Sequence, residues 1–219
     1  MFADAMDWDD IKQMPKFPKI DLDEPDTKTI ELDQQDAIIQ AIANPMDRAY
    51  ILFMAREMVR PSEARALCWE DLDFKHDRVT IRRHFSLNQI RPTTKAKQIK
   101  ILPLDGEVSL AIAKLPRHIT SPFVFQKKGY PYSESWGRKL WKRISKSLNV
   151  EISLYQGTRH SSATELAGRM GVDLAQEFLH HSSRAMTKRY AKQSVENLRK
   201  GLRDSLSSVY PNKKIEKKD

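Results

Sequence analysis

The segment from Tyr50 to Val59 is rich in large apolar residues and is followed at once by Arg60-Pro61. A helix this apolar is unsuited to the protein surface, so we expect it to cross the core. The residue before a proline is disfavoured in the α region, so this helix must end near Arg60. Pro61 suits the first turn of a second helix, which we expect to run to about Leu67. An arginine is thereby placed between two buried helices, where it either extends its stem towards solvent or serves a functional site.

Helix and strand signals alternate along the rest of the chain. Asp33 is a suitable N-cap for a helix with apolar residues at helical spacing, and Asn44-Pro45 ends that helix and starts the next. Short β-branched runs predict three strands, with a turn at 75–77 and a cationic loop at 88–98: Leu72–Phe74, Val79–Ile81 and Ile99–Leu102. Further helices are expected over Glu107–Leu115, Ser133–Leu148 with Ser133 as N-cap, Thr158–Met170 and Asp173–His180, and after caps at Ser183 and Ser194.

This order of elements predicts a mainly α fold with a small antiparallel β-sheet at one edge, in the α+β class. We expect three regions. Residues 1–30 carry Pro15, Pro18 and Pro25 among charged residues, a composition typical of a linker, which we interpret as the remnant of a preceding domain. Residues 31–205 form the folded domain, and residues 206–219 form a basic C-terminal tail.

Charge is distributed unevenly along the chain. The 219 residues include 38 Lys and Arg against 29 Asp and Glu, a net charge of +9. Residues 1–36 hold four lysines and eleven acids, a net of −7, so the remainder holds 34 basic and 18 acidic residues, a net of +16. A folded part this basic favours a polyanionic partner, most often nucleic acid, although a merely solvated surface would account for the same charge.

Cysteine usage and hydropathy indicate the compartment. Cys68 is the only cysteine, which excludes an intrachain disulfide and a zinc site built on cysteines, and fits a reducing environment. No apolar run approaches the roughly 18 residues of a membrane span, and the acidic N-terminus is unlike a signal peptide. We therefore expect a cytoplasmic protein with no membrane partner.

Four short motifs follow one another along the folded domain. The first is Arg60-Pro61-Ser62-Glu63, followed by Leu67-Cys68-Trp69-Glu70-Asp71. The second is Thr94-Lys95, ending in Ile101-Leu102-Pro103-Leu104, and the third runs from Gly157-Thr158-Arg159 to Thr164. The fourth is Leu179-His180-His181-Ser182-Ser183, with Tyr190 nine positions after His181. In order and spacing these motifs resemble those of the tyrosine recombinase (phage integrase) family, over residues 31–205.

The resemblance implies a role for each singular residue. Tyr190 is the expected nucleophile, Arg60, Arg159 and His181 are expected to stabilise the transition state, and Lys95 is the expected general acid. The residue types suit this chemistry, because arginine forks can hold the non-bridging oxygens of a phosphodiester and a lysine can protonate the leaving 5′-oxygen. A tyrosine phenol, with a reference pKa of about 10, needs a proton acceptor or a cationic surrounding before it attacks. No carboxylate cluster points to a two-metal site, so we expect no metal and no cofactor.

The sequence departs from the family pattern at a few places. Gln156 stands where the family has a histidine; it can orient a phosphate oxygen or the nucleophile but cannot accept a proton. His160 is expected to pack behind the site. Glu57-Met58 replace the usual Thr-Gly, and we expect both residues to lie within the apolar helix that begins before Tyr50. His180 replaces a glycine. Glu63 is expected to hold an arginine in place.

The resemblance implies the catalytic domain of a site-specific DNA recombinase, an integrase of a phage or other mobile element. It would cleave and rejoin double-stranded DNA through a 3′-phosphotyrosyl intermediate in the prokaryotic cytoplasm or nucleoid. A full-length protein would assemble as a homotetramer on DNA, whereas this chain alone could be monomeric. Two alternatives remain open at this point: a type IB topoisomerase that nicks and closes one duplex, and a DNA-binding protein that keeps the fold without cleaving.

Overall fold

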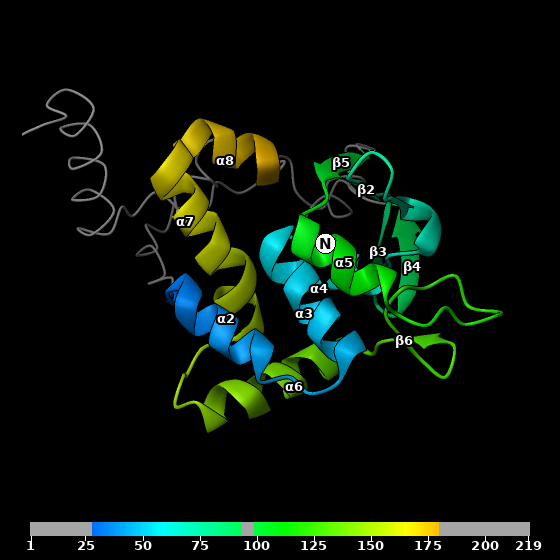
Figure 1. Cartoon of the computed structure of the whole chain (residues 1–219), viewed down its shortest axis with the longest axis horizontal. Coiled ribbons are helices and arrows are strands. Elements are labelled where there is room, and N and C mark those ends of the chain that lie inside the picture. The colour runs from blue at the N-terminus through cyan, green and yellow to red at the C-terminus, as the bar shows by residue number, and fades with distance from the viewer. Residues whose placement is uncertain (1–27, 93–98, 180–219) are drawn as a thin grey trace, which may run out of the picture.

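The computed structural model describes residues 28–92 and 99–179, in which helices gather on one side of the molecule and most strands on the other (Figure 1). The helical elements are α2 (Leu32–Gln40), α3 (Pro45–Arg56), α4 (Pro61–Arg65), the 3-10 turn η1 (Trp69–Asp71), α5 (Gly106–Ala113), α6 (Glu134–Ser147), the π-turn η2 (Gln156–His160), α7 (Ser161–Met170) and α8 (Val172–Leu179). The strands are β1 (Leu72–Asp73), β2 (Arg78–Ile81), β3 (Arg83–Ser86), β4 (Gln89–Pro92), β5 (Lys100–Pro103), β6 (Gln126–Lys127) and β7 (Tyr130–Pro131). The predicted α+β class is confirmed.

Helix α3 is the centre of the core, as the apolar segment predicts. All residues from Ala49 to Ala55 are buried, and the ring of Tyr50 packs edge-on against Phe125 and Tyr132, each with a centroid distance of 5.2 Å. The helix begins where expected, because the Asn44 side chain accepts hydrogen bonds from the backbone N–H groups of Met46 and Asp47, both at 3.0 Å. Pro61 starts α4, so the predicted break between the two helices is confirmed.

Helix α2 begins two residues before its predicted start. Its N-cap is Glu31, whose backbone is extended and whose side chain makes no capping bond, and Asp33 lies inside the first turn. There the Asp33 carboxylate still faces the positive end of the helix dipole. The residue before the cap is held from outside, because the Ile30 N–H donates to Ser161 Oγ at 3.0 Å. A long-range contact therefore holds the backbone just before this helix.

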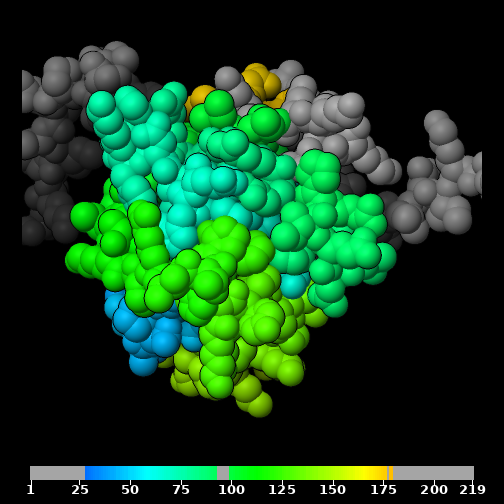
Figure 2. All heavy atoms as spheres, turned by 90° about the vertical axis from the view of Figure 1, so that its right-hand side faces the viewer, coloured from blue at the N-terminus to red at the C-terminus, as the bar shows by residue number. Residues whose placement is uncertain are grey.

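The three predicted strands form one antiparallel sheet in the order β1-β2-β5. Val79 pairs with Leu102 and Ile81 pairs with Lys100, so the buried faces of β2 and β5 coincide. The turn expected at 75–77 joins β1 and β2, with Asp77 in the left-handed region at φ +47°. Seen from the strand-bearing side, green and cyan segments cover most of the face, and the blue N-terminal part of the described chain appears only at the lower left (Figure 2).

Two hairpins were not predicted. The loop expected at 88–98 begins inside a hairpin of β3 and β4, whose two turn residues Leu87 and Asn88 both have positive φ. A second hairpin joins β6 to β7 through Lys128 and Gly129, again both at positive φ. Two-residue hairpin turns with this geometry favour Asn and Gly, and each turn here has only one such residue, which weakens the sequence signal.

The C-terminal half of the described chain is helical, with one irregularity. Helices α5, α6 and α8 match the expected ranges to within a few residues, and Ser133 occupies the N-cap position of α6 without a side-chain capping bond. The helix expected from Thr158 instead opens with the π-turn η2 before α7. Residues 1–27, 93–98 and 180–219, which contain most of the expected linker, the basic tail and the helices after Ser183 and Ser194, lie outside the described residues. No helix of the described part has the length and hydrophobicity needed to cross a bilayer.

Candidate active site

Arg60 lies in the short connection between α3 and α4, as predicted. It is the N-cap residue of α4, with an extended backbone, and its side chain is 38% exposed. Glu63 of the same turn holds it at two points: Oε2 accepts the Arg60 backbone N–H at 2.9 Å and Oε1 accepts Nη1 at 3.2 Å. The expected role of Glu63 in holding an arginine matches this geometry, which leaves part of the guanidinium open to solvent.

Arg159 is buried in η2, with 2% of its surface exposed. Its Nη1 donates to the carbonyl oxygen of Met58, and its Nη2 donates to the carbonyl oxygen of Leu179 at 3.4 Å. One guanidinium thus joins the connection that carries Arg60 to the C-terminal end of α8. Leu179 is also the first residue of the fourth sequence motif.

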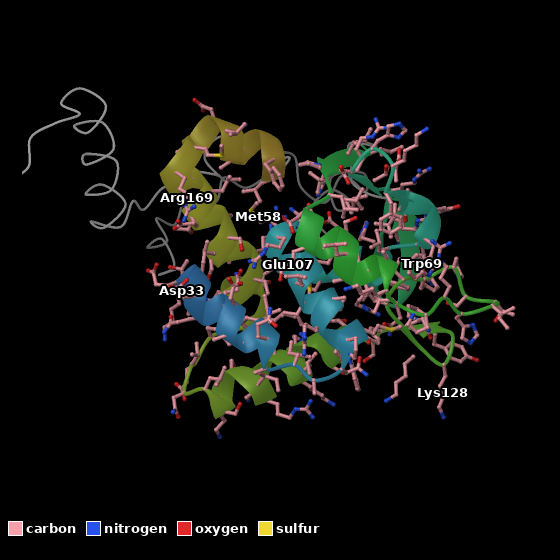
Figure 3. The ribbon with its side chains drawn as sticks, in the orientation of Figure 1. Asp33, Met58, Trp69, Glu107, Lys128 and Arg169 are labelled. Carbon is pink, nitrogen blue, oxygen red and sulfur yellow. The ribbon has the colours of Figure 1, made fainter. Side chains whose placement is uncertain are left out.

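The backbone at Met58 departs from the expected helix. Helix α3 ends at Arg56, Glu57 is its C-cap, and Met58 has φ +47°, in the left-handed region. The expectation that Glu57-Met58 continue the helix is therefore wrong. The left-handed turn directs the Met58 carbonyl to Arg159, while the Met58 side chain belongs to an apolar cluster with Ala163, Ala167 and other residues of α7 and α8. Figure 3 shows Met58 in the middle of the molecule, between these helices and α5.

Gln156 opens the π-turn. Its Oε1 accepts a hydrogen bond from Ser153 Oγ at 2.7 Å, and its backbone N–H donates to Ser153 Oγ at 3.3 Å. The ring of His160, at the other end of the turn, packs edge-on against Tyr155 with a centroid distance of 4.6 Å. This contact agrees with a packing role for His160. Ser153 thus holds both the side-chain amide and the backbone of Gln156, and the amide is able to form hydrogen bonds at the site.

The π-turn is shaped by residues that the motifs did not reveal. Gly157 lies so close to Trp141 of α6 that an added Cβ would be 2.3 Å from Cζ2 of the indole. The buried Gln35 of α2 donates through Nε2 to the carbonyl oxygens of Gly157 at 2.8 Å and Thr158 at 3.3 Å. Gln35 could have been found in the sequence as a polar residue on the side of α2 that faces the core. A buried amide needs hydrogen-bond partners, so such a residue is expected to bind another element.

Lys100 is a further residue that the motifs did not reveal. It lies on β5, its side chain is 5% exposed, and its Nζ is 2.7 Å from Glu63 Oε1. Burial works against ionisation of Glu63, but the charge and hydrogen bond of Lys100 and the bonds from Arg60 outweigh it and lower the pKa of the carboxyl. Burial lowers the pKa of the Lys100 ammonium, against the attraction of Glu63, and the like charges of Arg60 and Arg159 also lower it.

Arg60 and Gln156 line one groove of about 1120 Å³, formed by α4, β3, α6 and residues 150–156. Six basic and two acidic residues contribute to its walls: Lys28, Arg60, Arg65, Arg138, Lys142 and Lys146, with Glu134 and Glu151. Such an excess of cations around one groove favours an anionic ligand. Within residues 28–92 and 99–179, no group of three or more His, Cys, Asp or Glu side chains is arranged to hold a metal ion.

The structure therefore brings together part of the predicted site. Arg159 is bonded to the carbonyl of Met58 in the connection that also carries Arg60, and Gln156 opens the same π-turn as Arg159. Lys95, His181 and Tyr190 lie outside the described residues, so their predicted roles stay predictions.

Comparison with known proteins gives a consistent family. The sequence model of the phage integrase family matches residues 28–197. A putative integrase/recombinase of Sinorhizobium fredii is 30% identical over 169 residues, 69% of this chain and 36% of that protein. Tyrosine recombinase XerA of Pyrococcus horikoshii is 26% identical over 195 residues, 85% of this chain and 64% of that protein. The chain thus spans about one third to two thirds of the lengths of these relatives.

Solved structures agree with the fold. The Tn1549 transposon integrase, in complex with a circular intermediate DNA, superposes with a TM-score of 0.71 at 21% identity, over 93% of this chain and 75% of that one. XerA recombinase superposes with a TM-score of 0.64 at 17% identity, over 85% of this chain and 66% of that one. The catalytic domain of bacteriophage HP1 integrase superposes with a TM-score of 0.55 at 18% identity, over 84% of this chain and 98% of that one.

Proposed function

We propose that this chain, which belongs to the phage integrase family, is the catalytic domain of a site-specific DNA recombinase of a phage or other mobile element. One observation carries the proposal: the buried guanidinium of Arg159 is bonded to the carbonyl of Met58, two residues before Arg60. This bond joins the two arginine motifs across 99 residues of chain, which is the arrangement needed for two arginines to act on one phosphate.

In the proposed reaction the Tyr190 phenol loses its proton to water among the cations of the site, and its oxygen attacks the scissile phosphorus. A bond forms between phosphorus and the tyrosine oxygen while the bond from phosphorus to the 5′-oxygen breaks, and Lys95 donates the proton that the leaving oxygen needs. Arg60, Arg159 and His181 stabilise the charge that develops on the non-bridging oxygens. Gln156 orients an oxygen at the site. The resulting 3′-phosphotyrosine keeps an ester of similar energy, so a 5′-hydroxyl of another strand can reverse the step without a cofactor.

The partner is double-stranded DNA. The basic groove that contains Arg60 and Gln156 supports this assignment, because fixed cations along a groove release the counterions of a nucleic acid. We infer that a full-length protein acts as a homotetramer in the prokaryotic cytoplasm, and that this chain alone binds DNA weakly, as a monomer.

The experiment is covalent capture on nicked DNA. The 219-residue chain is incubated with a pool of duplexes of random sequence, each nicked so that cleavage releases a short 5′-hydroxyl fragment that diffuses away. We expect adducts that resist denaturant, enrichment of one family of sites, and no effect of EDTA. Tyr190→Phe is expected to abolish the adduct.

Each other outcome has a defined meaning. No adduct with the wild-type chain, repeated with any longer natural form of the protein, overturns the recombinase proposal in favour of DNA binding without cleavage. An adduct that survives Tyr190→Phe keeps the reaction and removes Tyr190 as its nucleophile. Relaxation of supercoiled DNA without exchange between two captured sites would identify a topoisomerase.

A further inference from the structure

Lys100 is a buried cation that the proposed reaction does not use. It lies on β5 opposite Ile81, and its side chain points into the protein beside Glu63 of α4. A lysine is seldom buried this deeply unless it is paired, because removing an ammonium from water is costly. Its pairing with Glu63, at 2.7 Å, accounts for the burial but leaves open what the pair does for the protein.

Glu63 is shared between two cations. Its Oε1 accepts from Arg60 Nη1 at 3.2 Å and from Lys100 Nζ at 2.7 Å, and its Oε2 accepts the Arg60 backbone N–H at 2.9 Å. Glu63 is 3% exposed and Lys100 is 5% exposed, whereas the side chain of Arg60 reaches the groove and is 38% exposed. Contacts therefore run from the buried Lys100 through Glu63 to Arg60, whose side chain reaches the groove.

The charges of these three side chains decide how strongly Arg60 can act. With one anion and two cations the cluster has a net charge of +1, and without Lys100 the net charge is zero. A carboxylate at 3.2 Å competes with a phosphate for the same guanidinium donors, and the competition is strong where water is excluded. A second cation on the buried side of Glu63 offsets that competition without occupying the groove.

We propose that Lys100 is a positioning residue that balances the charge of Glu63, so that the carboxylate orients Arg60 while the charge of Arg60 remains available to the scissile phosphate. This inference rests on the proposed function, because it concerns the same site. Lys100 acts through Glu63 and does not touch the DNA. Its contribution therefore depends on the carboxylate being there to balance.

The simpler reading is a buried ion pair that only stabilises the fold. Such pairs can often be replaced by neutral residues at little cost, provided that both charges are removed together. The two readings differ in what happens to the cleavage rate when the lysine loses its charge but keeps a hydrogen-bond donor. Lys100→Gln makes that change, and Lys100→Arg keeps the charge.

The test is a double-mutant cycle with the rate of adduct formation at saturating captured substrate as its readout. The variants are Lys100→Gln, Lys100→Arg, Glu63→Gln and the double variant Glu63→Gln/Lys100→Gln, with Lys114→Gln, at the exposed C-cap of α5, as control. Each rate is divided by the folded fraction, taken from thermal unfolding of the same sample.

We expect Lys100→Gln to slow adduct formation by about tenfold or more, while Lys100→Arg stays within about threefold of wild type. In the Glu63→Gln background, the same change at Lys100 is expected to cost less than about threefold, because no carboxylate remains to be balanced. A rate for Lys100→Gln within about threefold of wild type overturns the inference, as does an equal cost in both backgrounds. An adduct with the wild-type chain confirms covalent DNA cleavage in every one of these cases, so the failure of this inference is distinguished from the failure of the proposed reaction.

Discussion

Met58 links the two arginine motifs through one backbone conformation. A left-handed φ costs a residue other than glycine about 1 kcal/mol, and here it turns the carbonyl towards Arg159. Burial of the methionine side chain among Ala163, Ala167 and their neighbours offsets that cost. The family has a glycine at this position, for which the conformation is free of strain. The departure is thus compensated by packing.

Glu57, the residue before it, is expected to destabilise the fold when ionised. It is 2% exposed and accepts the Asp105 N–H at 2.8 Å, and burial raises the pKa of its carboxyl from 4.5 to about 7. Because the folded-state pKa lies above the unfolded value, the favourable contribution of the protonated carboxyl is present below pH 4.5 and is lost as the pH rises through about 7. Glu57→Gln keeps the acceptor and is expected to raise the free energy of unfolding by about 2 kcal/mol at pH 8, shrinking towards zero near pH 4.5.

Urea unfolding of both proteins across this pH range measures the difference. Glu151→Gln removes an exposed carboxylate and is the matched control, with an expected change within about 0.5 kcal/mol at every pH. A difference between Glu57→Gln and wild type that did not vary with pH would contradict the assignment.

At the scale of elements, η2 is the piece on which the site depends. Three successive carbonyl groups of this turn accept side-chain donors: Ser161 Oγ binds the oxygen of Gln156, and Gln35 Nε2 binds those of Gly157 and Thr158. A π-turn leaves the regular ladder of hydrogen bonds, and such turns occur frequently at functional sites. Helix α2 and helix α7 thereby hold the turn that carries Gln156 and Arg159.

The approach of α6 to this turn predicts a strong effect at Gly157. The change Gly157→Ala would place a methyl group 2.3 Å from Cζ2 of Trp141, a large and fully buried side chain. We expect a loss of about 2 kcal/mol in the free energy of unfolding, as overpacking of a core produces. Gly106→Ala, at the start of α5 with nothing within 4 Å of the new Cβ, should change it by less than about 0.5 kcal/mol. Equal effects at the two glycines in chemical denaturation would show that the close approach does not limit the turn.

At the scale of the whole molecule, cations from elements far apart in sequence line the groove that contains Arg60 and Gln156. Lys28 precedes α2, Arg60 precedes α4, and Lys142 and Lys146 project from α6. The groove in which Arg60 and Gln156 lie is lined by six basic residues against two acidic ones, and this excess of cations supports a role in holding a polyanion.

Salt dependence of DNA binding tests this surface. If Lys142 contacts a phosphate, Lys142→Gln should weaken binding of the chain to a generic duplex and reduce the slope of log K against log salt by about 1, because one fewer counterion is released. Lys75→Gln, in the turn between β1 and β2 and outside the groove, should leave the slope unchanged. Fluorescence anisotropy at several salt concentrations measures both, and equal slopes for the three proteins would exclude Lys142 as a phosphate contact.

Much of the fold was predictable because its signals are local. Asn44-Pro45 and Arg60-Pro61 mark helix boundaries through steric and capping effects confined to a few residues, and both boundaries are confirmed. The hairpin turns at Leu87-Asn88 and Lys128-Gly129 were missed because their sequences only partly match the turn preference, and pairing of the flanking strands decides them. At the site, Arg60, Arg159 and Gln156 could be predicted because they lie in short sequence motifs. Gln35 and Lys100 could not, because their roles come from contacts with distant residues.

The sequence by itself determined where the main helices and the three strands of the central sheet lie, that the domain is basic, and which residues are candidates for chemistry on a phosphate. Hydrophobic periodicity and proline act over a few neighbouring residues, and net charge is a property of the whole composition. All three can therefore be recognised from the sequence alone. Only the tertiary structure decided the left-handed turn at Met58, the π-turn at Gln156 and the sharing of Glu63 between Arg60 and Lys100. Each of these depends on a contact between residues at least 37 positions apart, and packing overrides local preference at such contacts.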